Sequence, residues 1–354
     1  MPNASTFIHE GRGAIGGGPL NGYGARNKVR DWSAQMADRL VTVFGGSGFV
    51  GRYVVKRLAK QGWRVRVAVR RPQEAGFLRP MGDVGQIAIV QANVRHKASV
   101  ELAVHGAEAV VNLVGLIAES GSQSFNLIQA QGAKRVAEAA KAAGASRFVQ
   151  LSAIGAAADA PSEYGRSKAA GEAGVKAAFP EAVILRPSLV FGPEDKFFNR
   201  FANLARYSPV LPLIGGGANL VQPVYAGDVA DAVVAAVNGT VTAADKPYEL
   251  GGPTVYSFRQ LMELILKVTG RKALLLPVPL GLAKLQAAAV GWLPGAPITV
   301  DQVKMLEVDN VVAPDAPGFD AFGITPDSVE AVVPSYLLRF RKTGQYATAT
   351  TVEG

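Results

Sequence analysis

Short apolar runs alternate with longer segments of helical periodicity along the first half of the chain. The β-branched run at 39–44 leads into a glycine-rich turn, after which apolar residues between 53 and 59 recur at the spacing of one helix face. Gly62 follows, and residues 63–69 alternate between polar and apolar positions as a half-buried strand does. This order predicts a strand, a glycine turn, an amphipathic helix and a second strand.

The alternation continues beyond this first unit. The pattern predicts strands at 87–90, 109–114, 148–151 and 182–185, and helices at 99–105, 126–143 and 164–178. Strands separated by helices of ten or more residues are typical of a parallel sheet that helices cover on both faces. We therefore predict an α/β fold with a Rossmann-type doubly wound parallel sheet.

The rhythm changes after Pro187, where proline and glycine become frequent. Short helices are predicted at 227–237, 257–269, 280–290 and 326–333. This pattern favours a main domain at 39–192 and a smaller mixed α/β lobe at 193–334 over the carboxyl edge of the sheet. The segment near 221–240 is expected to return to the main domain, so that the two parts are interleaved.

The two ends of the chain have compositions of their own. Seven glycines between Gly11 and Gly24 disfavour any helix or strand in residues 1–38, which we expect to form a mobile arm. A plain flexible tail and an organellar targeting segment are both open interpretations of this arm. Residues 335–354 mix apolar and basic side chains beyond the last predicted helix. We interpret them as a C-terminal docking tail.

The net charge is +9, from 37 basic and 28 acidic residues. Nine of the basic residues and no acid occur within 39–71, so the remainder of the chain holds 28 of each sign. A nucleic-acid-binding protein usually spreads its basic charge or collects it in a tail. The confined charge therefore favours one bound anion and argues against nonspecific binding of nucleic acid.

The sequence lacks cysteine and has three scattered histidines, His9, His96 and His105. Disulfide scaffolds, thiolate catalysis, iron–sulfur clusters and cysteine-type zinc sites are therefore excluded, and no metal site is predicted. No run of about 18 uncharged apolar residues occurs, so no membrane-spanning helix is expected. The apolar stretch 280–293, with Lys284 inside it, suits either an interfacial helix that touches lipid or a buried helix of the small lobe.

The turn after the first strand has the glycine spacing of a dinucleotide site. Gly45 allows the tight turn, Gly48 lets the backbone approach a pyrophosphate, and Gly51 lets the helix pack closely on the strand. The helix start adds free N–H groups and the positive end of its dipole. Arg52 in the first helical turn opposes that dipole, a cost that a bound phosphate offsets. From this turn we predict cofactor contacts by Gly45, Ser47, Gly48, Phe49, Val50, Gly51 and Arg52.

Arg70 and Arg71 end the second predicted strand, at the position that selects between the two nicotinamide cofactors. An acid here would hold the ribose 2′-hydroxyl of NAD, whereas two guanidinium groups fork onto a 2′-phosphate. We therefore predict that both arginines bind NADPH. A pair of solvated surface arginines is the alternative interpretation.

Four segments carry a family resemblance. They are GGSGFVG at 45–51, NVRHKASVELAVHGAEAVVNLVG at 93–115, YGRSK at 164–168 and ILRPSLVFGPED at 184–195. Together they resemble the short-chain dehydrogenase/reductase superfamily in its extended or atypical branch. The resemblance implies further cofactor contacts: Asn93 and Val94 at the adenine, Leu113, Val114 and Gly115 along the cofactor, and Pro187 and Leu189 near the nicotinamide.

A closer similarity covers residues 39–346. VTVFGGSGFVGRYVV, RVAVRRP and SYLLRFRKTGQY at 335–346 look like the accessory subunits of respiratory complex I that are built on this fold. This resemblance implies tight NADPH binding, a structural role, and partners among the subunits of the peripheral arm and the quinone-site region. It also implies a peripheral location on the inner side of the energy-transducing membrane, either the bacterial cytoplasmic face or the mitochondrial matrix side. Residues 280–293 and 335–346 are the candidate membrane contacts.

Tyr164 and Lys168 lie four residues apart, so they share one face of their predicted helix. In a reductase the lysine lowers the pKa of the tyrosine and holds the nicotinamide ribose, and the tyrosine transfers the substrate proton. The third group is a hydroxyl from the preceding strand. Here Ala153 stands in the expected register, and Ser152 serves only if the register slips by one. We predict Tyr164, Lys168 and Ser152 as an incomplete catalytic set that also contacts the cofactor.

Three functions fit these features. They are a non-catalytic NADPH-binding accessory subunit, an NADP-dependent reductase or epimerase of a nucleotide sugar or similar small molecule, and a nucleotide-sensing regulator. The incomplete hydroxyl set and the segment at 335–346 favour the first.

Overall fold

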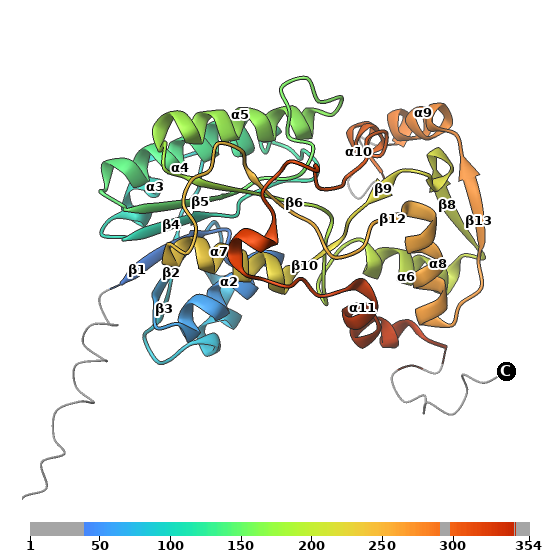
Figure 1. Cartoon of the computed structure of the whole chain (residues 1–354), viewed down its shortest axis with the longest axis horizontal. Coiled ribbons are helices and arrows are strands. Elements are labelled where there is room, and N and C mark those ends of the chain that lie inside the picture. The colour runs from blue at the N-terminus through green and yellow to red at the C-terminus, as the bar shows by residue number, and fades with distance from the viewer. Residues whose placement is uncertain (1–38, 291–297, 343, 345–354) are drawn as a thin grey trace, which may run out of the picture.

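The computed structural model describes residues 39–290, 298–342 and 344. The arm predicted at 1–38 lies outside this part of the chain, as do residues 291–293 of the predicted interfacial stretch and most of the predicted tail. Figure 1 shows a larger sheet domain with a smaller lobe beside it.

Seven parallel strands form the central sheet, in the order β11-β6-β5-β4-β1-β2-β3. Their bounds are β1 Leu40–Phe44, β2 Arg64–Val69, β3 Ile87–Gln91, β4 Ala109–Asn112, β5 Arg147–Leu151, β6 Val183–Pro187 and β11 Tyr248–Leu250. The chain builds outward from β1 through β2 and β3, and then continues on the other side of β1 with β4. The predicted doubly wound parallel sheet is therefore confirmed. The reversal between β1 and β4 marks the crevice where such sheets bind ligands.

Helices cover both faces of the sheet (Figure 1). One face carries α3 Lys97–Val104, α4 Gln131–Ala142 and α5 Glu163–Ala178, and the other carries α2 Phe49–Lys60 and α7 Ala226–Asn238. Because both faces are covered, Val41, Val43 and Val111 have no exposed surface, and the strands are short and apolar.

Two segments differ from the predicted pattern. The helix predicted at 126–143 starts as a π-helical turn, η2 Asn126–Ala130, before α4 begins. A 3₁₀ segment, η1 Pro72–Met81, follows β2 where the pattern predicts no element. Pro80 lacks the N–H that a regular α-helix would use near the end of this segment.

The smaller lobe consists of helices and short strand pairs. Its helical segments are α6 Phe198–Tyr207, η3 Gly215–Gly217, α8 Phe258–Thr269, α9 Leu280–Val290, α10 Val300–Met305, α11 Val329–Leu337 and η5 Leu338–Phe340. Its strand pairs are β8 Val210–Ile214 with β13 Leu274–Val278, and β9 Leu220–Val221 with β12 Tyr256–Ser257. A further parallel pair joins β7 Val190–Phe191, which comes directly after β6 in the chain, to β10 Val224–Tyr225. The lobe has its own core, in which Phe198, Leu213 and Ile265 are fully buried.

The chain crosses between the two parts more than once. α7 packs against α2, and β11 forms an edge of the main sheet. Later the segment η4 Phe319–Phe322 returns to the core of the sheet domain, where Phe319 and Phe322 are buried, before α11 closes the small lobe. Segments far apart in the sequence therefore complete each core.

Residues 335–340, the start of the predicted docking tail, are part of the small lobe. α11 extends to Leu337, and Tyr336, Leu337 and Phe340 are buried in the core of the small lobe. The Tyr336 hydroxyl donates to the buried carboxylate of Asp195 at 2.7 Å. This corrects the sequence expectation for 335–340, because the apolar side chains interpreted there as a docking surface are core residues.

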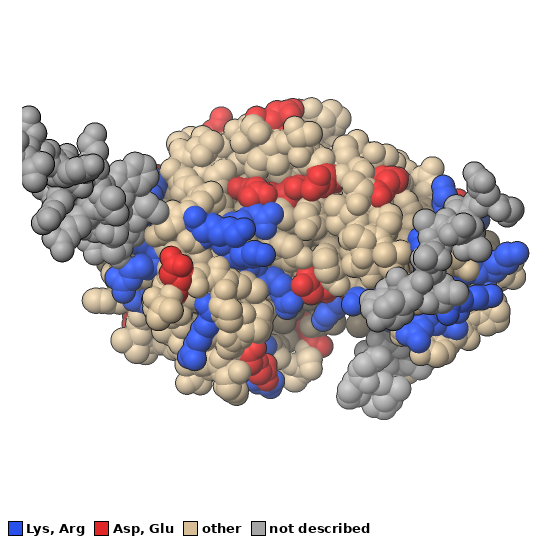
Figure 2. Space-filling view, turned by 90° about the horizontal axis from the view of Figure 1, so that it is seen from below, with Lys and Arg blue, Asp and Glu red and all other residues tan. Residues whose placement is uncertain are grey.

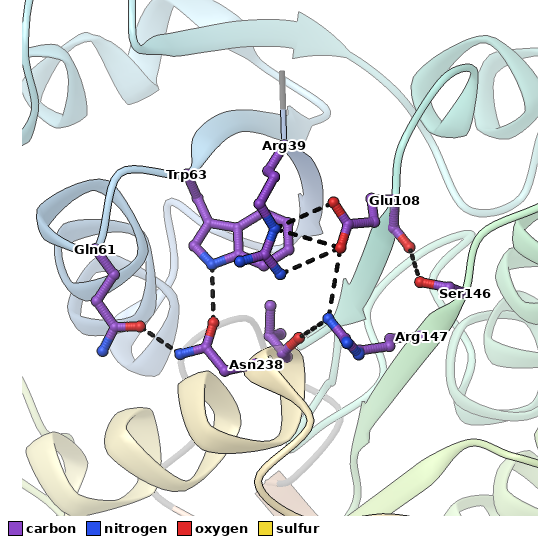
Figure 3. A network of polar contacts seen from close by, with 8 residues as sticks. Arg39, Gln61, Trp63, Glu108, Ser146, Arg147 and Asn238 are labelled. Atoms are coloured by element: carbon purple, nitrogen blue, oxygen red, sulfur yellow. Dashed lines mark hydrogen bonds and ion pairs between the residues drawn. The ribbon is translucent and has the colours of Figure 1, made fainter. Parts of the chain in front are cut away.

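A polar network closes the amino edge of the sheet, at the end opposite the glycine turn (Figure 3). Arg39 lies 3.9 Å above the ring centre of Trp63 and donates to both oxygens of Glu108 at 3.1 to 3.4 Å. Arg147 shares Glu108 at 3.5 Å, and the Trp63 indole N–H donates to Asn238 at 3.0 Å. The network joins the start of β1 to β4, β5 and the end of α7, and so fixes the sheet from the side that carries no glycine turn.

Candidate functional site

The glycine turn at 45–51 joins the carboxyl end of β1 to the start of α2. Gly45 has φ +76°, a left-handed conformation, and a Cβ on Gly51 would lie 2.3 Å from the carbonyl oxygen of Gly45. The Gly48 N–H donates to that oxygen at 2.9 Å, and no side chain caps the helix. The first N–H groups of α2 therefore remain available to a phosphate.

The turn faces β4 at the point where the strand order reverses. A Cβ on Gly45 would lie 3.2 Å from the carbonyl carbon of Leu113. The Leu113 N–H donates to Phe44 at 3.0 Å, and the Val114 N–H donates to the side chain of Asn112 at 3.2 Å. Leu113 and Val114 thus lie alongside the turn, which is the arrangement that a cofactor running along both segments requires.

The remaining turn residues have different surroundings. Ser47, Phe49 and Val50 are half-buried. Arg52 donates to Glu194 at 3.2 Å, and the carboxylate of Glu194 also accepts the hydroxyl of a neighbouring tyrosine at 2.8 Å. Arg52 is therefore engaged by a carboxylate from a residue far away in the sequence, which no local pattern indicated.

The two arginines at the end of β2 also differ from each other. Arg70 is exposed and lines an open cavity of about 360 Å³ together with Asn93. It donates to the side-chain oxygen of Gln123. Arg71 pairs instead with Glu74 of η1 at 3.0 Å. Of the two, Arg70 is the arginine that faces the cavity at the carboxyl end of β2 and β3.

This cavity contains polar residues that the sequence pattern did not single out. His96 and Ser99 line it beside Asn93, whose side-chain oxygen accepts the N–H of Arg95 at 3.1 Å. Val94, predicted to lie at the adenine, is 6% exposed and belongs to the core beneath α3 and α4. The available signal was position: these residues directly follow a parallel strand, at the edge where such sheets bind ligands.

Lys168 lies at the other end of the crevice. Its Nζ donates to the carbonyl of Leu151 at 3.4 Å and lies 3.3 Å from the place where a Cβ on Gly115 would stand. Burial lowers the pKa of Lys168 to about 8, and the carboxylate of Glu172 partly opposes this shift. Lys168 and Gly115, which the sequence pointed to separately, therefore lie together.

Gln129 borders the same point and was not predicted. Its Oε1 lies 3.6 Å from the Cβ position of Gly115, is buried, and has no hydrogen-bond partner among the residues that the structure describes. Its Nε2 donates to Ser167 of α5 at 3.0 Å. Gln129 belongs to the π-helical turn η2, and such turns occur frequently at functional sites.

Tyr164 is held at the start of α5 by the smaller lobe. Asp301 of α10 accepts the N–H groups of Glu163 and Tyr164 at 2.6 and 3.0 Å. The tyrosine ring packs edge-on against Phe125 with 5.9 Å between centroids, and Lys168 Nζ lies 5.8 Å from the ring centre. Burial raises the pKa of Tyr164 to about 12. A tyrosine that transfers protons needs a shift in the opposite direction.

Ser152 carries the hydroxyl that the sequence offered as the third group of this set. It is 4% exposed, and its Oγ is buried without a hydrogen-bond partner in the described part of the chain. Ala153 is half-buried, because successive side chains in an extended segment point to opposite sides. The hydroxyl is therefore enclosed, and the more open position carries a methyl group.

An ion-pair cluster supports the strand that precedes the predicted nicotinamide contacts. Arg186 donates to both oxygens of Glu172 at 2.9 and 2.7 Å and lies 3.6 Å from Glu249. These hydrogen bonds to Glu172, together with the charge of Glu249, raise the pKa of Arg186. The backbone carbonyls of Pro187 and Leu189 accept N–H groups at 3.1 and 3.0 Å. The end of β6 is thus fixed by side chains and backbone together.

Within residues 39–290, 298–342 and 344, no group of three or more His, Cys, Asp or Glu side chains is arranged to hold a metal ion. Over the same residues, no helix has both the length and the apolar character that a bilayer crossing requires.

Comparison with known proteins adds three findings. A family model described as the NAD dependent epimerase/dehydratase family matches residues 41–251. A relative from Arabidopsis thaliana, named NADH dehydrogenase (ubiquinone) 1 alpha subcomplex subunit 9, mitochondrial, is 34% identical over 325 residues, which cover 89% of this chain and 81% of the relative. A ceramide reductase from Caulobacter vibrioides is 34% identical over 244 residues, covering 68% of this chain and 74% of the relative.

Among solved structures, an NADPH-dependent quinone oxidoreductase from Escherichia coli, complexed with NADPH, has a TM-score of 0.66. It is 21% identical, and the match covers 84% of this chain and 99% of that chain. At this identity the match shows a shared fold.

Proposed function

The chain belongs to the NAD dependent epimerase/dehydratase family, and from that membership we propose that it is a non-catalytic, NADPH-binding accessory subunit of respiratory complex I. The Arabidopsis relative supports this proposal, because it is named as a subunit of NADH dehydrogenase (ubiquinone) and matches most of the chain. The proposed role is to hold the cofactor as a structural element and to stabilise the peripheral arm of the complex near the membrane.

The residues of the crevice fit a phosphorylated dinucleotide. The free N–H groups at the start of α2 suit a pyrophosphate, and Arg70 suits the 2′-phosphate because guanidinium binds phosphate oxygens in a fork. Lys168 suits a ribose hydroxyl, and the buried oxygen of Gln129 lies beside it near Gly115. The nicotinamide supplies hydride chemistry when bound. Arg52 and Arg71 can bind a phosphate only when they break their ion pairs with Glu194 and Glu74, respectively.

The enclosed hydroxyl of Ser152 is the observation that carries the non-catalytic part of the proposal. A reductase needs a hydroxyl beside its tyrosine to hold the substrate oxygen. Ser152 presents no accessible oxygen, and Ala153 has none to present. The raised pKa of Tyr164 acts in the same direction, since a phenol with a pKa of about 12 is a weak proton donor to a substrate oxygen. Tyr164 and Lys168 then serve to hold the ribose.

The location follows from the same proposal. We infer a peripheral position on the inner side of the energy-transducing membrane, beside subunits of the peripheral arm and the quinone-site region. Leu282 and Leu285 of α9 support a membrane-bordering place, because they are 57% and 68% exposed while Ala283 and Ala287 face the lobe. The described part of 335–346 gives less support, since its apolar side chains are buried.

The test is to isolate the native particle in mild detergent and to follow its bound cofactor. We expect the chain to migrate with the respiratory complex and to retain NADPH whose fluorescence stays constant while NADH reduces quinone. Oxidation of the bound NADPH at the turnover rate would contradict the structural role. Release of the chain as a free monomer with no respiratory partner would contradict the assignment to the complex.

An NADP-dependent reductase or epimerase is the second candidate, and the relative named ceramide reductase favours a reductase. Tyr164→Phe separates the two functions. A reductase loses its NADPH-dependent activity by orders of magnitude, whereas an accessory subunit keeps its cofactor and its place in the complex. Ala153→Ser is the matched variant, because it restores a hydroxyl at the more open position without touching the tyrosine.

A further inference from the structure

Two stretches without any acidic residue meet in the small lobe. Residues 196–227 contain Lys196, Arg200 and Arg206, and residues 331–352 contain Arg339, Arg341 and Lys342, with no Asp or Glu in either stretch. The first stretch forms α6 and the second forms η5, and these two elements pack against each other. Basic side chains predominate at the small-lobe end of the face in Figure 2, whereas both signs occur over the main sheet.

An open cavity of about 460 Å³ lies where α6 meets η5. Its lining residues are Asp195, Lys196, Asn199, Arg200, Asn203 and Phe340. The single carboxylate, that of Asp195, is 4% exposed and accepts hydrogen bonds from Tyr336 at 2.7 Å and from the Asn199 N–H at 3.2 Å. Neutral donors satisfy this buried carboxylate, so the exposed charged side chains of the cavity lining are those of Lys196 and Arg200.

The basic residues at the rim of this cavity lie at the N-terminal end of α6, where the helix dipole adds to their positive potential. Lys196 precedes α6 and Arg200 lies in its first turn, a position where positive charge opposes the helix dipole. None of the ion pairs of the described residues involves Lys196, Arg206 or Arg339. Instead, Arg339 donates to the side chain of Asn199, which carries no charge. A bound anion offsets the unfavourable energy of such an arrangement.

The shape of the rim selects among anions. Arg200 and Asn203 lie about one helical turn apart on α6, roughly 4.5 Å along its axis, and Lys196 lines the same cavity just before the helix begins. An extended chain presents side chains to one side every second residue, about 6.6–6.8 Å apart, so two successive acidic side chains can face Lys196 and Arg200 from outside the cavity. A flat anionic bilayer matches it less well, because acidic side chains share the same face of the molecule over the main sheet (Figure 2).

We propose that the cationic groove between α6 and η5 docks an extended segment of a neighbouring protein subunit with acidic side chains at alternate positions. This inference rests on the proposed function, since it assumes a place in a larger assembly. The groove lies outside the nucleotide crevice, so it provides an attachment that does not depend on the bound cofactor.

The experiment uses the full chain and two short fluorescent peptides of equal length, one with glutamate and one with glutamine at alternate positions. Fluorescence anisotropy measures binding at low and at physiological salt. The test variant is Lys196→Glu with Asn203→Glu. Lys60→Glu with Gln73→Glu is the matched control, because it makes the same change in charge at exposed positions of α2 and η1.

We expect the glutamate peptide to bind the native chain and the control variant, with affinity that falls as salt rises. Binding to the groove variant should weaken by about tenfold or more, and the glutamine peptide should not bind. Equal binding of both peptides, or equal weakening in both variants, overturns the proposal.

Two further arms test other occupants. If vesicles containing phosphatidylglycerol bind through Lys196 and Asn203 while the glutamate peptide does not, the groove recognises lipid headgroups and the proposal is overturned. If a chain ending at Gly344 binds the peptide and the full chain does not, the occupant is the chain's own C-terminal segment, which contains Glu353. NADPH retention and co-migration with the respiratory complex are measured on the same variants. Failure of the native chain to co-migrate overturns the proposed function, whereas the peptide arms still decide the groove.

Discussion

Lys168→Met is expected to stabilise the cofactor-free protein while it weakens cofactor binding. Lys168 is 6% exposed, and burial lowers its pKa from 10.5 to about 8. At about 1.4 kcal/mol for each tenfold change in proton affinity, this difference corresponds to at most about 3–4 kcal/mol of destabilisation by the charged form. The weak hydrogen bond to Leu151 is lost in the variant, so we expect a net gain of about 1–2 kcal/mol at pH 7.

The pH dependence gives this prediction its sign. The pKa of Lys168 is lower in the folded protein than in the unfolded chain, so the charged lysine destabilises the fold fully below pH 8. The penalty disappears as the pH rises toward 10.5, where the lysine is neutral in both states. Urea unfolding of NADPH-free protein at pH 7 and at pH 10 measures the difference. Lys56→Met, at an exposed position of α2, is the control and should change little.

Two results would refute this reasoning. A loss of stability of equal size at both pH values would mean that Lys168 supports the fold through its packing and hydrogen bond, and that burial of its charge costs nothing. Unchanged NADPH affinity in the variant would mean that Lys168 does not hold the cofactor. A stabilised variant with weakened cofactor binding would show that this buried lysine is kept for its ligand at the expense of the empty fold.

Three further predictions concern other parts of the molecule. Arg70→Asp should weaken NADPH by about tenfold or more relative to NADH, because a carboxylate repels a 2′-phosphate, and Arg71→Asp should change this ratio less; titration with both cofactors measures it. Asp228→Asn should raise stability above pH 6 and have little effect below pH 4. Burial raises the pKa of Asp228 from 3.8 to about 6, so the ionised form destabilises the fold and native stability falls as the pH rises between these values; calorimetry across this range checks the slope. Glu108→Gln should lower the free energy of unfolding in urea by about 1 kcal/mol, because two half-exposed arginines lose their shared carboxylate. A variant as stable as the native protein would contradict the role of the network.

The sheet and its covering helices follow from local pattern, and most of them could be predicted. Strand β1, the glycine turn and α2 lie within 21 consecutive residues, from Leu40 to Lys60, so the residues that determine them are neighbours in the sequence. The same holds for α5, whose start at Glu163 lies one residue from its predicted place. The segment at 335–340 shows the limit of this approach. Its mixture of apolar and basic residues looks like a tail until Tyr336 meets Asp195, 141 residues away.

The candidate site was predictable where it is built from backbone and not where it depends on distant partners. The glycine turn required no knowledge of the fold, since the conformation of Gly45 is a local property. Arg52 was assigned to a phosphate because its helix start was visible, whereas Glu194 was not. Gln129 was missed for the converse reason, because its unpartnered oxygen has meaning only once Gly115 and Lys168 lie beside it.

The distribution of charge in the folded molecule differs from its distribution along the sequence. The excess of nine basic residues lies within 39–71, yet Arg39, Arg52, Arg57 and Arg71 of that unit each pair with a carboxylate from elsewhere in the structure or from η1. Counting charges along the sequence does not reveal these ion pairs, because their carboxylates lie outside 39–71, where basic and acidic residues are equal in number. The converse holds in the small lobe. Basic and acidic residues are equal in number outside 39–71, yet two acid-free stretches meet in this lobe, and Lys196 and Arg339 have no carboxylate partner among the described residues. The strongest uncompensated positive field therefore need not lie where the sequence is most basic. This reasoning makes the groove between α6 and η5, and not the basic helix α2, the surface on which a charge reversal should most affect assembly.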